Sequence, residues 1–241
     1  MTITKEKIVG ELVAEDYRTA QIFKNHKIDF CCNGNRSIET VCESGSIPLD
    51  ELLTEIATLQ QASTGRSNDY KTWPLDLLAD YIIKKHHRYV ATRSSEIVPY
   101  LEKLCKVHGS RHNELFEITE QFKASVGELA AHMKKEELIL FPFIKKMVEA
   151  KQEEKEIPLP NFGTVENPVE MMKEEHDVEG ARFRKIAGLT NNYQVPSDAC
   201  NTYRVTFSLL KEFEEDLQLH IHLENNILFP KAIALEKELR G

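Results

Sequence analysis

The sequence contains one motif twice, as HMKKEELILFP at residues 132–142 and as HIHLENNILFP at residues 220–230. Both copies have the pattern H-x-x-x-E-x-x-I-L-F-P, and agreement at six spaced positions is improbable by chance. Each copy follows another histidine at a similar distance, since 45 residues separate His87 from His132 and 44 separate His176 from His220. The repeat unit therefore has the length of a helix pair. Two such pairs predict a four-helix bundle with approximate two-fold symmetry.

The histidine and the glutamate of each copy lie four residues apart, which places them on one face of a helix. In both copies the pair continues an apolar stripe that steps by three and four residues. The stripes consist of Leu115, Ile118, Phe122, Leu129, Ile139 and Phe143 around the first pair, and of Leu210, Phe213, Leu217 and Ile227 around the second. We therefore expect one imidazole and one carboxylate from each copy to point into the core.

The other two helices of the predicted bundle supply further histidines. His176 lies on a stripe with Met172 and Phe183 and is expected to point inward. The first helix offers two adjacent histidines. Its apolar spacing favours His86 and the repeat spacing favours His87, so periodicity alone does not distinguish them.

Helical periodicity dominates the whole chain, and glycine and proline are sparse, with 10 and 9 of 241 residues. The sequence therefore predicts an all-α fold. Four long helices are expected at residues 74–107, 113–148, 167–188 and 197–235, each start or end marked by a cap, a proline or a glycine. Because their connections are short or moderate in length, an up-down bundle is the expected arrangement.

A smaller helical part is expected ahead of the bundle. Residues 6–27 and 48–61 have helical patterns, and the turn DFCCNGN at residues 29–35 lies between them. The polar stretch at residues 62–68 is typical of a linker. We therefore divide the chain into a small helical domain at residues 1–65 and a bundle domain at residues 66–241.

The amino-acid composition argues against some kinds of binding partner. The chain has 31 Lys+Arg against 39 Asp+Glu, a net charge of -8, and no basic cluster of the kind that binds nucleic acid. No apolar run is long enough for a membrane span, and the N-terminus has no export signal, so we expect a cytoplasmic protein. The five cysteines are odd in number and include the adjacent pair Cys31 and Cys32, which indicates reduced thiols.

Buried histidines and glutamates need an explanation, because an unpaired carboxylate in a bundle core destabilises the fold. One interpretation is two hydrogen-bonded His–Glu pairs. Two symmetric copies, each with a further histidine on the preceding helix, fit metal coordination better. Four imidazoles and two bridging carboxylates would give each of two metals about four protein donors, a set that suits first-row metals and leaves coordination positions open.

The His…His-x-x-x-Glu…His…His-x-x-x-Glu constellation resembles that of the hemerythrin-like bundle. The segment DFCCNG at residues 29–34 is similar to the small cysteine-motif domain ahead of such a bundle in the di-iron proteins of iron–sulfur cluster repair. EEHD at residues 174–177 and LENNILFP at residues 223–230 also match that family's pattern. The resemblance covers essentially the whole chain and implies a hemerythrin-like up-down four-helix bundle with a small N-terminal helical domain.

The resemblance also implies a function. Such a protein repairs iron–sulfur clusters damaged under nitrosative or oxidative stress, by donating iron from a labile centre of two non-haem iron ions bridged by oxo and carboxylate groups. The implied partners are damaged iron–sulfur proteins or a cluster-assembly scaffold, with nitric oxide or dioxygen as small ligands. The chain would act as a monomer or a homodimer, with no nucleic acid and no membrane.

Site residues follow from the resemblance position by position. The implied metal ligands are His87, His132, Glu136, His176, His220 and Glu224, with both glutamates bridging. Cys31 and Cys32 are candidates for a functional thiol pair, and Glu175 for a role beside the ligands. His222, two residues after His220, is expected on the outer face of its helix and exposed to solvent.

Two other functions fit the same residues. The first is reduction of nitric oxide to nitrous oxide, because two open metal sites would hold two molecules close together. The second is binding or sensing of oxygen or nitric oxide, which leaves Cys31 and Cys32 without a role. Whether the protein is an enzyme is open at this point.

Overall fold

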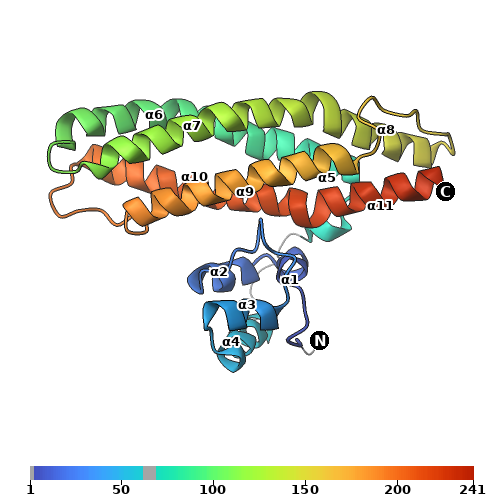
Figure 1. The fold of residues 1–241 in the computed structure, drawn as a ribbon, viewed down its shortest axis with the longest axis horizontal. Coiled ribbons are helices and arrows are strands. Elements are labelled where there is room, and N and C mark those ends of the chain that lie inside the picture. The colour runs from blue at the N-terminus through green and yellow to red at the C-terminus, as the bar shows by residue number, and fades with distance from the viewer. Residues whose placement is uncertain (1–2, 62–68) are drawn as a thin grey trace.

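Four long helical rods form the body of the computed structural model, which describes residues 3–61 and 69–241. Figure 1 shows the rods side by side, running alternately in opposite directions. The rods are, in chain order, α5 (Leu75–Tyr81), η2 (Ile82–His87) and α6 (Arg88–His108); α7 (Glu114–Lys135), η3 (Glu136–Leu140) and α8 (Phe141–Gln152); α9 (Glu166–Leu189); and α10 (Asn201–Leu223), η4 (Glu224–Leu228) and α11 (Phe229–Arg240). The predicted all-α bundle is confirmed.

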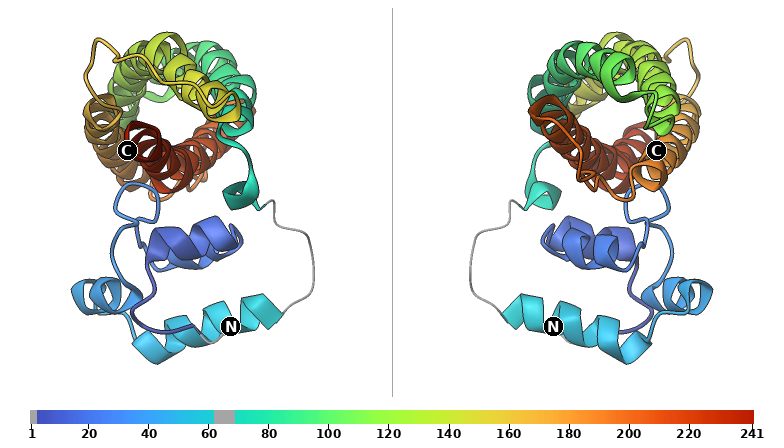
Figure 2. Two further views of the ribbon diagram at one scale, coloured as in Figure 1. Left: turned by 90° about the vertical axis from the view of Figure 1, so that its right-hand side faces the viewer. Right: turned by 90° about the vertical axis from the view of Figure 1, so that its left-hand side faces the viewer.

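Apolar side chains fill the space that the four rods enclose. α6 contacts both α7 and α10, and α9 contacts α7 and α10, so the rods close into a ring that Figure 2 shows end-on. At one level Phe213 stacks on Phe183 with ring centroids 5.6 Å apart and meets Phe122 edge-on at 5.1 Å. All three rings are buried, which makes this aromatic cluster a large contributor to the hydrophobic core.

Three of the rods contain a π-helical turn, namely η2, η3 and η4. A π turn holds more residues than an α turn, so the residues after it are rotated out of the preceding phase. This corrects the expected stripe in the second rod: Ile139 is 50% exposed, and Leu140, at 1%, takes the inward position. Simple 3.6-residue periodicity could not predict this shift.

The N-terminal part consists of short helices that lie against one flank of the bundle (Figures 1 and 2). These helices are α1 (Val9–Glu15), α2 (Thr19–Asn25), α3 (Ile38–Gly45) and α4 (Leu49–Gln61). The 3-10 turn η1 (Tyr70–Thr72) precedes the first rod. α1 contacts α10 and η4, so the small part covers the fourth rod. The predicted linker at residues 62–68, and with it the proposed domain boundary, lies outside the described residues.

The helix predicted at residues 6–27 is divided in two. Asp16 separates α1 from α2, because its carboxylate accepts hydrogen bonds from the backbone N–H and guanidinium of Arg18, and its carbonyl accepts one from the Thr19 hydroxyl. Such side-chain bonds compete with helix continuation. α3 was not predicted, although Ser37 caps it by accepting from the backbone N–H of Thr40 at 3.2 Å.

Among the described helices, none combines the length and the apolar character that crossing a membrane requires.

Candidate metal centre

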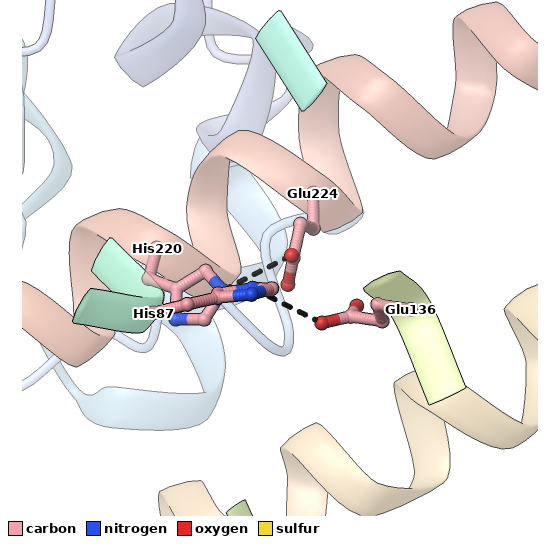
Figure 3. A group of neighbouring side chains, drawn as sticks. All are labelled: His87, Glu136, His220 and Glu224. Atoms are coloured by element: carbon pink, nitrogen blue, oxygen red, sulfur yellow. Dashed lines mark hydrogen bonds and ion pairs between the residues drawn. The ribbon is translucent and has the colours of Figure 1, made fainter. Parts of the chain in front are cut away.

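Six side chains from all four rods converge inside the bundle. They form two groups of possible metal donors, each with ligand atoms within 4.8 Å of one another. The first group is His87, Glu136, His220 and Glu224, drawn in Figure 3, and the second is His132, Glu136, His176 and Glu224. Glu136 and Glu224 belong to both groups, so the structure brings together all six residues predicted as ligands.

Each glutamate presents one oxygen to each group. Oε2 of Glu136 lies 3.4 Å from Nε2 of His87, and Oε1 lies 3.3 Å from Nε2 of His132.

Glu224 repeats the arrangement on the opposite side. Its Oε1 lies 3.0 Å from Nε2 of His220, and its Oε2 lies 3.2 Å from Nε2 of His176. Two carboxylates whose four oxygens are divided between two pairs of imidazoles have the geometry of bridging ligands. The donor set therefore fits two neighbouring cations.

Burial supports the same conclusion. All six residues are at most 3% exposed. Within the described part of the chain, Nε2 of His87, both carboxylate oxygens of Glu136 and Oε2 of Glu224 are buried without a hydrogen-bond partner. Leaving several charged or polar atoms unsatisfied in a core is costly, and a bound cation would satisfy them together.

The π turns position three of these six residues. His87 is the last residue of η2, Glu136 the first of η3 and Glu224 the first of η4. π turns inside α-helices are frequent at functional sites, because the wider turn re-aims a side chain. In the first rod the π turn contains one more residue than an α turn. The side chain that reaches the donor group is therefore His87 and not His86.

His86 lies beside the centre but outside both donor groups. It is buried, its ring stacks on that of His220 with centroids 5.5 Å apart, and its Nδ1 lies 3.1 Å from Oδ2 of Asp216. The structure therefore places His87, and not His86, in a donor group, a distinction that the apolar spacing of the sequence alone did not make.

Three imidazoles of the donor groups are held from behind by a hydrogen bond to Nδ1. Nδ1 of His87 lies 2.7 Å from Oε1 of Glu137, and Nδ1 of His132 lies 2.7 Å from Oε2 of Glu175. Each carboxylate accepts from Nδ1–H, which fixes the ring and turns Nε2 toward the donor group. Glu175 therefore lies directly behind His132, one of the six donor residues, and also pairs with Lys135.

The third such bond joins Nδ1 of His176 to Oδ1 of Asn225 at 3.0 Å. From the sequence, Glu137 is either a residue that supports the site from outside, like Glu175, or a solvated helix residue, and Asn225 has no assigned role. Both occupy the position directly after the glutamate of a repeat copy, and this shared position was the signal that could have identified them.

The buried carboxylates and imidazoles of the centre shift one another's pKa values. Burial and the nearby Glu224 carboxylate act to raise the pKa of Glu136, but the neighbouring histidines outweigh them and hold it below its ordinary value. The pKa of Glu224 is lowered in the same way, against its burial, by His220 and His176. Burial would lower the pKa of His132, but the carboxylates raise it to about 9, and they also raise the pKa of His87. A cation that binds Nε2 of His132 would therefore compete with a proton for this atom.

Cys31 and Cys32 lie on the loop between α2 and α3, outside both ligand groups. With Asp29 they form a separate group of potential donors, and their sulfur atoms are 3.7 Å apart. The Cys32 thiol donates to the carbonyl oxygen of His176 at 3.4 Å, so the loop contacts the backbone of a residue in the second donor group. The neighbouring Cys32 thiol and burial raise the pKa of the Cys31 thiol well above its usual range.

The prediction for His222 is wrong. The side chain is 1% exposed, because the N-terminal part covers this face of α10 and places the rings of Tyr17 and Phe30 each 6.0 Å from the imidazole. Its Nδ1 accepts a hydrogen bond from Asn226, and burial lowers its pKa to about 3. Periodicity within one helix carries no information on what a separate part of the chain covers.

Comparison with known proteins agrees with this geometry. Residues 78–232 match the family described as the hemerythrin HHE cation binding domain, and residues 5–60 match a domain of unknown function, DUF542. A probable iron-sulfur cluster repair protein of Haemophilus influenzae is 33% identical over 97% of this chain and 99% of its own length. The iron-sulfur cluster repair protein YtfE of Yersinia pestis is 31% identical over 95% of this chain and 97% of its own length. The chain therefore belongs to the iron-sulfur cluster repair protein family and carries a hemerythrin HHE cation binding domain.

Proposed function

We propose that this chain holds two iron ions and donates iron to damaged iron–sulfur clusters. The observation that carries the proposal is the pair of four-donor groups that share both Glu136 and Glu224. An arrangement of this kind binds two cations side by side with only four protein donors each. Vacant coordination positions favour exchange or reactivity over a closed structural role.

Iron is favoured by the family and allowed by the ligands. Imidazole and carboxylate suit first-row transition metals generally, and the hemerythrin-type domain makes iron the expected one. Bound iron would supply an exchangeable, redox-active metal, and an oxo bridge between the two ions stays a prediction.

The chain's own residues hold the ligands ready for loading and release. Packing of the four rods, together with Glu137, Glu175 and Asn225, orients three of the imidazoles so that Nε2 faces the donor groups. Glu175 also reaches the surface, with 36% of its side chain exposed and Lys135 as its ion-pair partner. We assign it to the outer layer of the site, on the side that faces solvent.

The names of the relatives say iron-sulfur cluster repair and support a damaged cluster as the target. We further propose that the recipients are damaged iron–sulfur proteins or a cluster-assembly scaffold. The same proposal includes nitric oxide or dioxygen as small ligands of the irons and repair under nitrosative or oxidative stress. A role for the Cys31–Cys32 pair as thiol donors belongs to the same proposal. A cytoplasmic location and a monomeric or dimeric state stay predictions.

The test is reactivation of a [4Fe–4S] dehydratase that nitric oxide has inactivated. The iron-loaded protein should restore activity in proportion to the iron transferred. The variant His132→Ala should restore little, because it removes a ligand from the second donor group. The matched control is His112→Ala, since His112 pairs with Glu114 and Asp198 far from the centre and its loss should leave repair unchanged.

Equal reactivation by metal-free and iron-loaded protein would contradict iron donation. Nitrous oxide assays on the same samples separate the alternatives. Gas formed over many turnovers would indicate a nitric oxide reductase, whereas reversible binding of nitric oxide with no loss of iron would indicate a sensor.

A further inference from the structure

The outer partner of His176 differs in kind from the partners of the other two fixed ligands. His87 and His132 are held by the carboxylates of Glu137 and Glu175, but His176 is held by an amide, that of Asn225. Glu137 and Asn225 occupy equivalent positions in the two repeat copies, so a carboxylate can serve this position. The presence of an amide at position 225, where a carboxylate could also hold the imidazole, therefore needs a physical explanation.

The reason lies in the other half of the amide group. An amide carries two N–H donors beside its carbonyl, whereas an ionised carboxylate only accepts. Nδ2 of Asn225 donates to the carbonyl oxygen of Cys31 at 3.1 Å, while Oδ1 accepts from Nδ1–H of His176. One side chain thus joins the backbone between two adjacent thiols to a metal-ligand imidazole.

The rest of the loop is held by groups that do not touch a ligand side chain. Asn226 donates to the carbonyl of Phe30 at 3.2 Å, and Arg184 pairs with Asp29 at 3.0 Å. The Cys32 thiol donates to the carbonyl of His176, but that carbonyl belongs to the backbone of α9 and does not follow the imidazole. Among these described contacts, only Asn225 responds to the position of the ligand ring.

We infer that Asn225 is a positioning residue that couples occupancy of the metal centre to the conformation of the Cys31–Cys32 loop. A bound metal fixes the His176 ring through Nε2, the ring fixes the amide through Nδ1, and the amide fixes the carbonyl between the thiols. When the metal leaves, the ring and the loop become free to move together. Coupling between two sites is reciprocal, so the state of the loop also changes the affinity of the centre.

The inference rests on the proposed metal ligands, but its test does not use repair activity. Full-length protein, metal-free or loaded with Fe(II) under anaerobic conditions and desalted, is treated with iodoacetamide. Mass spectrometry then follows labelling of Cys31, Cys32 and Cys200. We expect labelling of Cys32 to be slower in the loaded protein by about 5-fold or more, the lower end of typical coupling between sites. Cys200, an exposed thiol just before α10, serves as the internal reference and should label equally in both states.

Asn225→Asp removes one of the two hydrogen bonds of the Asn225 amide and keeps the other. The aspartate keeps an acceptor for His176 but loses the donor to Cys31, so the variant should bind iron in the same ratio while labelling of Cys32 no longer depends on metal. Asn225→Ala, which loses both bonds, should also lose the dependence and bind iron more weakly. Arg184→Gln is the matched control, since it loosens the loop from Asp29 without touching a ligand and should keep the dependence.

Two results would overturn the inference. One is equal labelling of Cys32 in metal-free and fully loaded wild-type protein. The other is persistence of the metal dependence in both Asn225 variants, which would show that iron protects the thiols by binding them directly or through another contact. Failure of iron to bind at all appears separately in the metal analysis and refutes the proposed centre instead.

Discussion

Glu136→Gln is expected to lower the iron content of the protein from two ions to at most one per chain. Oε2 of Glu136 faces His87 and Oε1 faces His132, so this side chain serves both metal positions. The amide removes a negative charge and leaves one coordinating oxygen. Loss of an outer partner alone typically weakens metal binding about 10–100-fold, so loss of a shared ligand should weaken it by more than about 100-fold. Anaerobic Fe(II) titration followed by metal analysis measures the effect.

A second buried glutamate provides the control. Glu214 lies on α10 away from both donor groups, is 7% exposed and accepts a hydrogen bond from Gln218. Glu214→Gln should retain two irons. If Glu136→Gln also binds two irons as tightly as the wild type, this glutamate does not bridge.

Phe213→Ala is expected to lower the free energy of unfolding of the metal-free protein by about 3–5 kcal/mol. Phe213 is fully buried and packs against Phe183 and Phe122 from two other rods, so its removal leaves a cavity where three rods meet. Folded domains are stable by only about 5–15 kcal/mol, so the loss is a large part of the total.

Urea unfolding followed by circular dichroism measures this change. The matched control is Phe116→Ala, because Phe116 is 56% exposed and its truncation should cost less than about 1 kcal/mol. A loss below about 1 kcal/mol for Phe213→Ala would mean that the aromatic cluster does not hold the rods together.

Much of the bundle and its centre could be predicted because the two repeat copies support the same interpretation. A lone His-x-x-x-Glu pair at 132–136 would be ambiguous, but the second copy at 220–224 requires a shared structural reason. The pairing of each copy with an upstream histidine then placed donors on all four helices. Apolar spacing predicts helices well wherever one face is uniformly buried.

The remaining features depend on contacts that a periodic pattern does not contain. The π turns shift the inward phase by a residue, and this is why spacing could not decide between His86 and His87 and placed Ile139 wrongly. The N-terminal part covers the fourth rod, which buries His222 against expectation. Asn225 acts between two segments far apart in the sequence.

Diffraction from crystals of the iron-loaded protein, with data collected at the iron absorption edge, tests the central claim most directly. The account predicts two neighbouring anomalous peaks, one next to His87 and His220 and the other next to His132 and His176. Both peaks should lie within bonding distance of Glu136 and Glu224. A single peak, or two peaks that share neither glutamate, would contradict the account.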